Sequence, residues 1–471
     1  MIYDANVDDS NIFSGTIYDV CVIGAGAAGI TIANELGKAG KKIALCEAGA
    51  AEFTEESQEN YKGEVTGDPY FDLDVARLRF LGGTTNHWSG MCRSFDEADF
   101  DRTYLGNKYK WPIEYKEILR YRKEACNILE IKDDFEYNDI ERSNIKRIKF
   151  QFSPSVRFKG KYELQISKST NISLLINANL VDIDGDDGVV KVAYFRNYMN
   201  QKFSIKATKF IFAMGGIENS RYLLWFAQKY RAKYFDTSTP IGKYWMEHPH
   251  FTLGSALVDK SVSSNRFYSL THEAQKKSQI LNCGFRLTEL SHQGTKAMIR
   301  ELLCVAPKLG WKVAALAGKN LICGVKFRAV WEQAPVASNA VTLANDVGRF
   351  GIPSVNLKWS KNNLDRKTVK ESVRFFNNWL LKNDTGRIQL NEWMVDDTDY
   401  PTNDELAGCH HMGGTRMSNS SQLGVVDKNC KVYGSSNLYI AGSSIFTTGG
   451  HNNPTLPIVQ FSLRLSDYLK K

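Results

Sequence analysis

The sequence predicts an α/β protein in which a parallel-sheet domain is assembled from distant parts of the chain and a β-rich domain is inserted into it. Three observations support this fold. Residues 17–23 form a mostly apolar run, rich in β-branched residues and interrupted by Asp19, that leads directly into a glycine-rich turn and a helical segment. Residues 245–405 contain several alternating strand candidates, and residues 438–441 return to a strand before a glycine turn and a final helix. With 471 residues, the chain is also too long for one ordinary core.

The individual elements follow from local patterns. After the glycine turn, residues 30–36 are expected to form a helix. The strand expected at 42–46 then completes a βαβ unit. Strands are expected at 175–184 and 188–195, separated by a turn over 184–188, and another at 210–216 ends in glycines. The longest helix candidate spans about 365–382. A last helix is expected from Asn453, with Asn453 as its N-cap and Pro454 at the first helical position.

Composition limits the class of protein. The apolar content is 43% and the charged content 24%, and no run of about 18 apolar residues suggests a membrane span. The N-terminus is acidic and does not resemble a signal peptide, so a cytoplasmic location is predicted. Nine dispersed cysteines without a CxxC pair favour reduced thiols over disulfides or a zinc site.

The formal net charge of +8 is modest for this length. It fits a solvated basic surface, and the alternative is attraction of an anionic substrate or an acidic electron acceptor. No nucleic-acid-binding motif is present. His248 and His250 lie close together, but no third ligand lies near them, so no metal site is predicted.

The turn after the first strand has the spacing of a dinucleotide cradle. Gly24, Gly26 and Gly29 match G-x-G-x-x-G between a strand and a helix, with Ala28 inside the motif. The glycines permit a tight turn and a close approach to a pyrophosphate, and the helix start supplies amide donors. Glu47 follows Gly29 by eighteen residues, close to the position of the acidic residue that binds a ribose hydroxyl. The motif alone does not separate FAD from NAD.

Several further segments, in order along the chain, resemble the glucose–methanol–choline (GMC) oxidoreductases, which bind FAD. The branch they resemble is that of bacterial sugar and polyol dehydrogenases and pyranose oxidases. The matching segments are the cradle, the loop 79–90 with Gly82 and Gly83, residues 100–113, 213–221, 246–250 and 332–335, and the C-terminal block from Cys409 to Thr455.

This resemblance implies FAD as the cofactor and assigns residues to it. Gly82, Gly83, Asn86 and His87 would line the isoalloxazine, and His87 would either be joined covalently to the flavin or pack beside its ring. Leu180 falls on the adenine-side strand, at a position where relatives usually have valine. The other contacts would come from Gly442, Ser443, Asn453 and Pro454. The final helix would direct its positive end towards the reduced flavin.

Alcohol oxidation needs a base for the hydroxyl proton, and a histidine is suited to this role near neutral pH. By the resemblance, His410 is the catalytic base and Asn453 is the amide partner that orients the hydroxyl. Shifting the alignment by one residue, to match Gly414 and Thr415, selects His411 instead. His451 lies two residues before Asn453 and could also contact substrate or flavin.

These expectations define a Rossmann-like, discontinuous FAD-binding domain with an inserted α+β substrate domain built on an antiparallel sheet. The predicted FAD-binding parts are residues 1–110, 166–244 and 406–471, the last carrying the catalytic residues. Residues 111–165 form a connecting segment, and residues 245–405 form the substrate domain. The implied activity is FAD-dependent oxidation of a CH–OH group of a sugar, glycoside or polyol by hydride transfer to flavin N5. The alternatives are an FAD-containing lyase of the hydroxynitrile-lyase type and a non-catalytic flavoprotein subunit.

Overall fold

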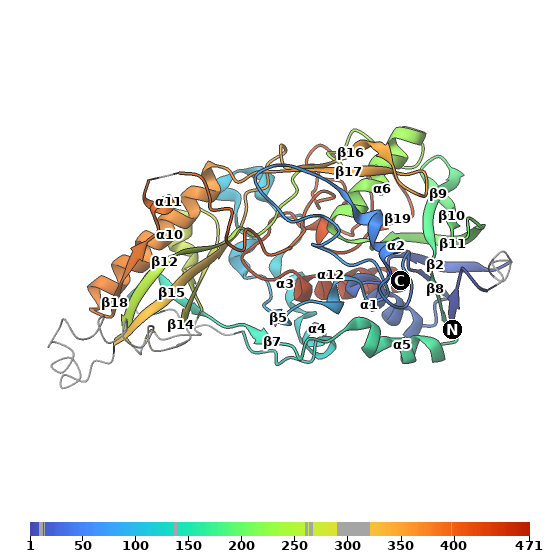
Figure 1. The fold of residues 1–471 in the computed structure, drawn as a ribbon. Coiled ribbons are helices and arrows are strands. Elements are labelled where there is room, and N and C mark those ends of the chain that lie inside the picture. Colours follow the sequence, from blue (N-terminus) through green and yellow to red (C-terminus); the bar gives the residue numbers. More distant parts are fainter. Residues whose placement is uncertain are drawn as a thin grey trace.

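Two large sheets lie towards opposite ends of an elongated molecule (Figure 1). The computed structural model describes residues 1–8, 13, 15–135, 140, 142–259, 262, 267–289, 321–396 and 398–471. The expected substrate segment, 245–405, includes residues 290–320, which lie outside the described residues.

The first large sheet has eight strands, six of them parallel. Strand β11 changes partners along one edge: Lys202–Lys206 pairs with β10, whereas Phe210–Phe212 pairs with β19. Across the sheet the strands are β1 (Ile2–Asp4), β8 (Ile172–Ile176), β3 (Ile43–Cys46), β2 (Ile17–Ile23), β11 (Lys202–Phe212), β10 (Val189–Arg196) and β9 (Asn179–Asp186), with β19 (Leu438–Ile440) beside β11.

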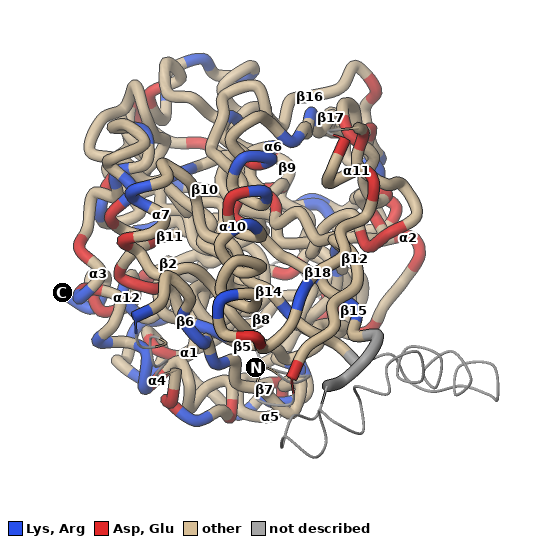
Figure 2. Tube along the Cα trace, turned by 90° about the vertical axis from the view of Figure 1, so that its left-hand side faces the viewer, with Lys and Arg blue, Asp and Glu red and all other residues tan. Residues whose placement is uncertain are grey.

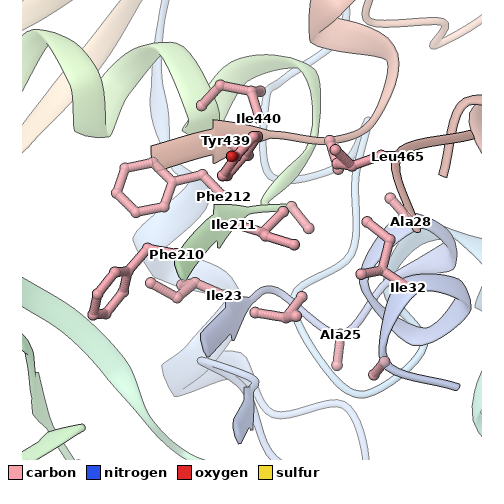
Figure 3. Close-up of a cluster of buried hydrophobic side chains, with 14 of the residues drawn as sticks. Ile23, Ala25, Ala28, Ile32, Phe210, Ile211, Phe212, Tyr439, Ile440 and Leu465 are labelled. Atoms are coloured by element: carbon pink, nitrogen blue, oxygen red, sulfur yellow. The ribbon is translucent and has the colours of Figure 1, made fainter. Parts of the chain in front are cut away.

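The core of this region joins the two ends of the chain. Helix α1 (Ala27–Lys38) follows β2 and packs against α12 (Thr455–Lys470), the C-terminal helix. Figure 3 shows Ala28 of α1 and Leu465 of α12 close to Ile211 of β11 and Ile440 of β19. These side chains are at most 5% exposed. Burial of this apolar surface therefore places the turn after β2 beside the strand and helix of the C-terminal segment.

The second large sheet has six antiparallel strands. In β15, Val325, Phe327, Ala329 and Trp331 alternate with more exposed residues, and they pack on the apolar side of helix α10 (Asn363–Lys382). The opposite face of the sheet is therefore not covered by α10. In order, the strands are β18 (Gly386–Leu390), β12 (His250–Asp259), β15 (Leu321–Trp331), β14 (Cys283–Glu289), β13 (Phe267–Leu270) and β6 (Ile145–Ile148).

Smaller elements lie outside the two large sheets. A three-stranded sheet has the order β16 (Ala340–Val347), β17 (Pro353–Trp359) and β4 (Gly63–Gly67), and β5 (Met91–Cys92) pairs with β7 (Gln151–Phe152). The remaining α-helices are α2 (Glu55–Gln58), α3 (Tyr115–Leu119), α4 (Arg122–Ile128), α5 (Phe158–Lys168), α6 (Gly215–Tyr230), α7 (His272–Ser278) and α11 (Glu392–Val395). The short 3₁₀ helices are η2 (Glu59–Tyr61), η3 (Gly83–Asn86), η4 (Glu97–Asp99), η5 (Thr103–Leu105), η6 (Asn107–Tyr109) and η8 (Ser443–Ile445). Among the described residues, no helix is both long and apolar enough to cross a membrane.

The predicted α/β fold is confirmed, whereas the division into a discontinuous domain and an inserted domain stays a prediction. The single strand expected over 175–184 is wrong. The chain turns at Asn177, which has a φ of +57° and whose side-chain amide donates to Asp4 at 2.7 Å. The turn expected over 184–188 is shorter than predicted, because the ladder continues to the pair Asp186–Val189.

The N-cap predicted for the last helix also needs correction. Helix α12 begins at Thr455, and Pro454 occupies the N-cap position without a side-chain cap. The amide of Asn453 lies instead 3.2 Å from His410. That side chain is therefore directed towards the histidine rather than towards the helix amides.

Candidate active site

A cavity of about 750 Å³ extends from the glycine turn after β2 to the face of the six-stranded sheet opposite α10. Its volume is in the range of small-molecule and cofactor sites. Most residues predicted for the site line it: Gly24, Gly26, Ala28, Glu47, Gly83, His87, His410, Gly442, Ser443, Asn453 and Pro454. Four others, Gly29, Gly82, Asn86 and Leu180, do not line it.

The cradle end of the cavity is built mainly from backbone. Gly24 has a φ of +105°, and a Cβ there would lie 2.5 Å from the carbonyl oxygen of Ala213. A Cβ on Gly29 would lie 1.9 Å from the carbonyl oxygen of Gly24, so Gly29 allows the helix to pack closely on the turn. The buried carboxylate of Glu47 accepts the amides of Ala25 and Gly49, each at 2.9 Å. Glu47 is therefore fixed in direction before any ligand binds.

The second glycine loop forms η3 and is held by its own side chains. Asn86 donates to the carbonyls of Leu81 at 2.9 Å and Gly83 at 3.0 Å, so its amide shapes the loop. His87 ends η3 and lines the cavity, and its pKa is lowered by burial and by Arg157. Leu180 lies in β9 within the hydrophobic core, where its carbonyl accepts the hydroxyl of Tyr222.

The cavity has room for a flavin dinucleotide. Gly26, Gly215 and Gly442 line it, and a Cβ on any of them would meet no atom within 4 Å. The first turns of α1 and α12 have no side-chain cap and no acidic residue, which leaves amide donors at the cavity wall. Open backbone, helix starts and an oriented carboxylate are the features that a dinucleotide needs.

His410 is the histidine best placed for chemistry in this cavity. Its Nε2 lies 3.2 Å from the side-chain nitrogen of Asn453, and its Nδ1 lies 2.8 Å from Nδ1 of His248. Its backbone amide lies 2.8 and 2.9 Å from the two carboxylate oxygens of Glu247. Burial and the neighbouring histidines, His248 first, hold the pKa of His410 well below its usual range.

These contacts are compatible with one tautomer of His410. The Asn453 amide nitrogen is a donor, so Nε2 of His410 accepts, and the ring proton resides on Nδ1. That proton is donated to Nδ1 of His248, which then carries its own proton on Nε2. His248 is fully buried, and burial lowers its pKa to about 4, so it remains a neutral acceptor.

The other two histidines considered from the sequence differ in their surroundings. Nε2 of His411 lies 2.9 Å from the hydroxyl of Tyr70, which donates to Glu247 at 2.5 Å, and burial lowers the pKa of His411 to about 3. His451 is 3% exposed, lies against Gly284, and neither of its ring nitrogens has a partner among the described residues. Both line the cavity, but neither lies within hydrogen-bonding distance of the Asn453 amide.

Sequence reasoning missed His248 and Glu247 as parts of this site. From the sequence, the segment Met246-Glu247-His248-Pro249-His250 matches the family pattern, and its histidines are considered only as metal ligands. Burial raises the pKa of Glu247 to about 7. A glutamate next to a histidine in an apolar stretch was the available signal, because such groups are rarely fully buried without a partner.

Comparisons with known proteins agree with this geometry. Residues 335–462 match the family model described as GMC oxidoreductase. The chain is 24% identical to a 2-methyl-1,2-propanediol dehydrogenase of Mycolicibacterium austroafricanum, over 96% of this chain and 95% of that protein. It is 22% identical to the fructose dehydrogenase large subunit of Gluconobacter japonicus, over 66% of this chain and 56% of that protein.

Solved structures show the same fold. A pyridoxine 4-oxidase from Mesorbium loti has a TM-score of 0.59 at 12% identity, covering 96% of this chain and 99% of that one. A formate oxidase has a TM-score of 0.56 at 16% identity, covering 97% and 98%. The family match covers the C-terminal part of the chain, residues 335–462, and together with the dehydrogenase relatives it identifies the protein as an FAD-dependent oxidoreductase similar to the GMC oxidoreductases.

Proposed function

We propose that this protein oxidises a CH–OH group of a sugar, glycoside or polyol, with His410 as the general base and Asn453 as the orienting amide. The observation that carries the proposal is the pairing of His410 Nε2 with the Asn453 amide at 3.2 Å on the wall of the cavity that contains the cradle. A basic nitrogen and an amide donor at one point form the pair that an alcohol hydroxyl requires.

The bound FAD supplies the hydride acceptor, and the chain supplies binding, orientation and proton transfer. Gly24, Gly26, Ala28, Gly29 and Glu47 would hold the dinucleotide. Near the ring would lie Gly82, Gly83, Asn86, His87, Gly442, Ser443 and Pro454. Leu180 belongs to the proposed adenine-side strand as a core residue that supports its position.

The proton path follows from the tautomer of His410. A substrate hydroxyl placed between the two side chains accepts from the Asn453 amide and donates to Nε2 of His410. Because burial lowers the pKa of His410, the ring is unprotonated at neutral pH and can accept that proton. The Nδ1 proton stays directed at His248, which fixes the ring plane while Nε2 gains its proton.

Two relatives support this substrate class. One is named for a diol and the other for fructose, and both are dehydrogenases. We place the substrate-binding region in the proposed inserted domain, residues 245–405, because its β14 and β15 line the far end of the cavity. A cytoplasmic location belongs to the proposal, and the described cysteines are consistent with it because seven of them are free thiols.

The decisive experiment is a visible spectrum of the purified flavoprotein before and after anaerobic addition of sugars and polyols. Bleaching of the flavin band is expected with at least one member. If the protein binds flavin but no sugar or polyol bleaches it, the proposed substrate class is contradicted. The alternatives, an FAD-containing lyase or a non-catalytic flavoprotein, would then be favoured. Acid precipitation of a parallel sample tests His87, because flavin in the pellet means a covalent bond and flavin in the supernatant means packing alone.

A further inference from the structure

Two arginines face each other at the end of the cavity farthest from the cradle. In the antiparallel pair β14–β15, Arg286 stands directly opposite Arg328, and both line the cavity. Phe267, opposite Arg286 on β13, lies under its guanidinium at 5.5 Å from the ring centre. The aromatic ring thus supports the guanidinium from one side.

This arrangement is electrostatically unfavourable by itself, because like charges directly opposite in a sheet repel. Arg328 has a counterion: Glu405 contacts its guanidinium and also lies 2.8 Å from Nδ1 of His250. The contacts with His250 and Arg328 lower the pKa of Glu405 to about 2, so this carboxylate is ionised at neutral pH. Within the described part of the chain, no carboxylate pairs with Arg286. Among these residues, Glu405 therefore neutralises Arg328 but not Arg286, and one guanidinium is left without a carboxylate partner.

Arg286 lines the same cavity as His410. On the same strand as Arg286, Gly284 contacts His451, and it pairs with Val330 on β15. Side chains two residues apart point to the same face, so Arg286 lies roughly 7 Å farther along this face than Gly284. One substrate could therefore reach from His410 to Arg286 within the cavity that both line.

We propose that Arg286, with Arg328 beside it, binds an oxyanion carried by the alcohol substrate, either a carboxylate or a phosphate ester. A guanidinium presents paired N–H donors that match the oxygens of either group. The oxyanion supplies the missing negative charge opposite Arg328. This inference rests on the proposed function, since the anion belongs to the same molecule as the oxidised hydroxyl.

Figure 2 looks at the six-stranded-sheet end of the molecule, where basic positions lie among the strands β14, β15 and β18. Lys326 offers a matched control in this region. It is exposed, lies on the same face of β15 two residues before Arg328, and does not line the cavity. If anions bound only through general surface charge, loss of Lys326 would weaken their binding as much as loss of Arg286. If they bind at a specific site, loss of Arg286 alone would weaken it strongly.

The test uses isothermal titration calorimetry of the FAD-loaded protein at fixed low ionic strength. The probes are glucose, glucuronate, glucose 6-phosphate and inorganic phosphate, and comparing carboxylate with phosphate identifies the preferred anion. We expect at least one anionic sugar to bind more tightly than glucose. Arg286→Gln should weaken that binding by about 10-fold or more, as expected for loss of a charged hydrogen bond. Lys326→Gln should change it less than about 2-fold.

Glucose binding as tightly as both anionic sugars would overturn the proposal. So would an unchanged affinity in Arg286→Gln, or no binding of any anionic probe. Flavin reduction is measured separately on the same samples. Anion binding that depends on Arg286 without flavin reduction would argue against the proposed chemistry at His410 while leaving the oxyanion site intact.

Discussion

The two ends of the cavity recognise their ligands by different means. At the cradle end, the contacts come from backbone amides, glycines with open space and two helix starts, with Glu47 as the main charged group. At the sheet end, they come from side chains such as Arg286, Arg328 and Phe267, which alternate along antiparallel strands. The cradle end is thus suited to one fixed cofactor, whereas the sheet end can be altered one side chain at a time.

His410, the proposed general base, lines the same cavity, and its removal is expected to have the largest effect. His410→Ala should slow flavin reduction by about 10²–10⁴-fold, the usual range for loss of a general base. FAD should remain bound, because the cradle contacts are untouched. Anaerobic stopped-flow spectroscopy at the flavin band measures the rate with the substrate identified from the panel.

His411→Ala is the matched control for this change. His411 contacts Tyr70 and not Asn453, so its loss should leave a much faster enzyme than loss of His410. If His411→Ala were the slower of the two, the base would have to be reassigned to His411.

At the cradle end, Glu47→Ala should weaken FAD binding rather than the chemistry. The change removes the acceptor for the Ala25 and Gly49 amides and the carboxylate proposed for the ribose. A loss of about 10- to 100-fold in FAD affinity is expected for buried hydrogen bonds to a charged group. Reconstitution of the apoprotein, followed by flavin fluorescence, measures this affinity. A slower flavin reduction at saturating FAD, with unchanged affinity for FAD, would contradict this prediction. It would show that Glu47 at the cradle end also affects the chemistry.

The contrast between the two ends also explains how much could be predicted from the sequence. Gly24, Gly26, Gly29 and Glu47 are close in sequence and have a fixed spacing, because one turn makes the whole cradle. Arg286 and Glu405 are more than a hundred residues apart, and only the strand register and the chain path bring them to one face. No local pattern encodes the presence of both side chains in one cavity.

The proposed catalytic pair is intermediate between these two cases in how far the sequence predicts it. His410 and Asn453 were identified by the resemblance, but the sequence left His411 open because the two histidines are adjacent. The structure separates them through their partners, Asn453 for one and Tyr70 for the other. The N-cap assignment of Asn453 failed for the same reason, since a side chain with two possible partners is resolved only by tertiary contacts.

A smaller effect is expected at His248, which acts on His410 rather than on substrate. His248→Leu removes the acceptor that holds the His410 proton on Nδ1, so the base would lose its orientation and its fixed tautomer. We expect flavin reduction to slow by about 10- to 100-fold, as for partners that orient a functional imidazole. His248→Asn places an oxygen near the Nδ1 position and should recover much of the rate. A general packing defect would not be rescued in this way and would also lower the melting temperature of both variants.

The smallest effect is expected from Glu247, and it concerns stability. Burial raises the pKa of this carboxyl from 4.5 to about 7 in the folded protein, so between these values the folded state binds more protons than the unfolded state. The stability contributed by Glu247 is therefore present at the acidic end of this window and falls as pH rises towards 7. Glu247→Gln cannot titrate, so the wild-type protein should lose up to a few kcal/mol relative to the variant across the window.

Melting temperatures of both proteins between pH 4.5 and 8 test this expectation, and their difference cancels the contributions of all other titrating groups. A difference that does not vary with pH would mean that Glu247 stays ionised throughout, held by the hydroxyl of Tyr70 and the backbone amides of His248 and His410, all of which donate to its carboxylate. In that case, the carboxylate belongs to a permanently charged centre beside His410. The proton taken from substrate would then be stabilised by this fixed negative charge in addition to the tautomer held by His248.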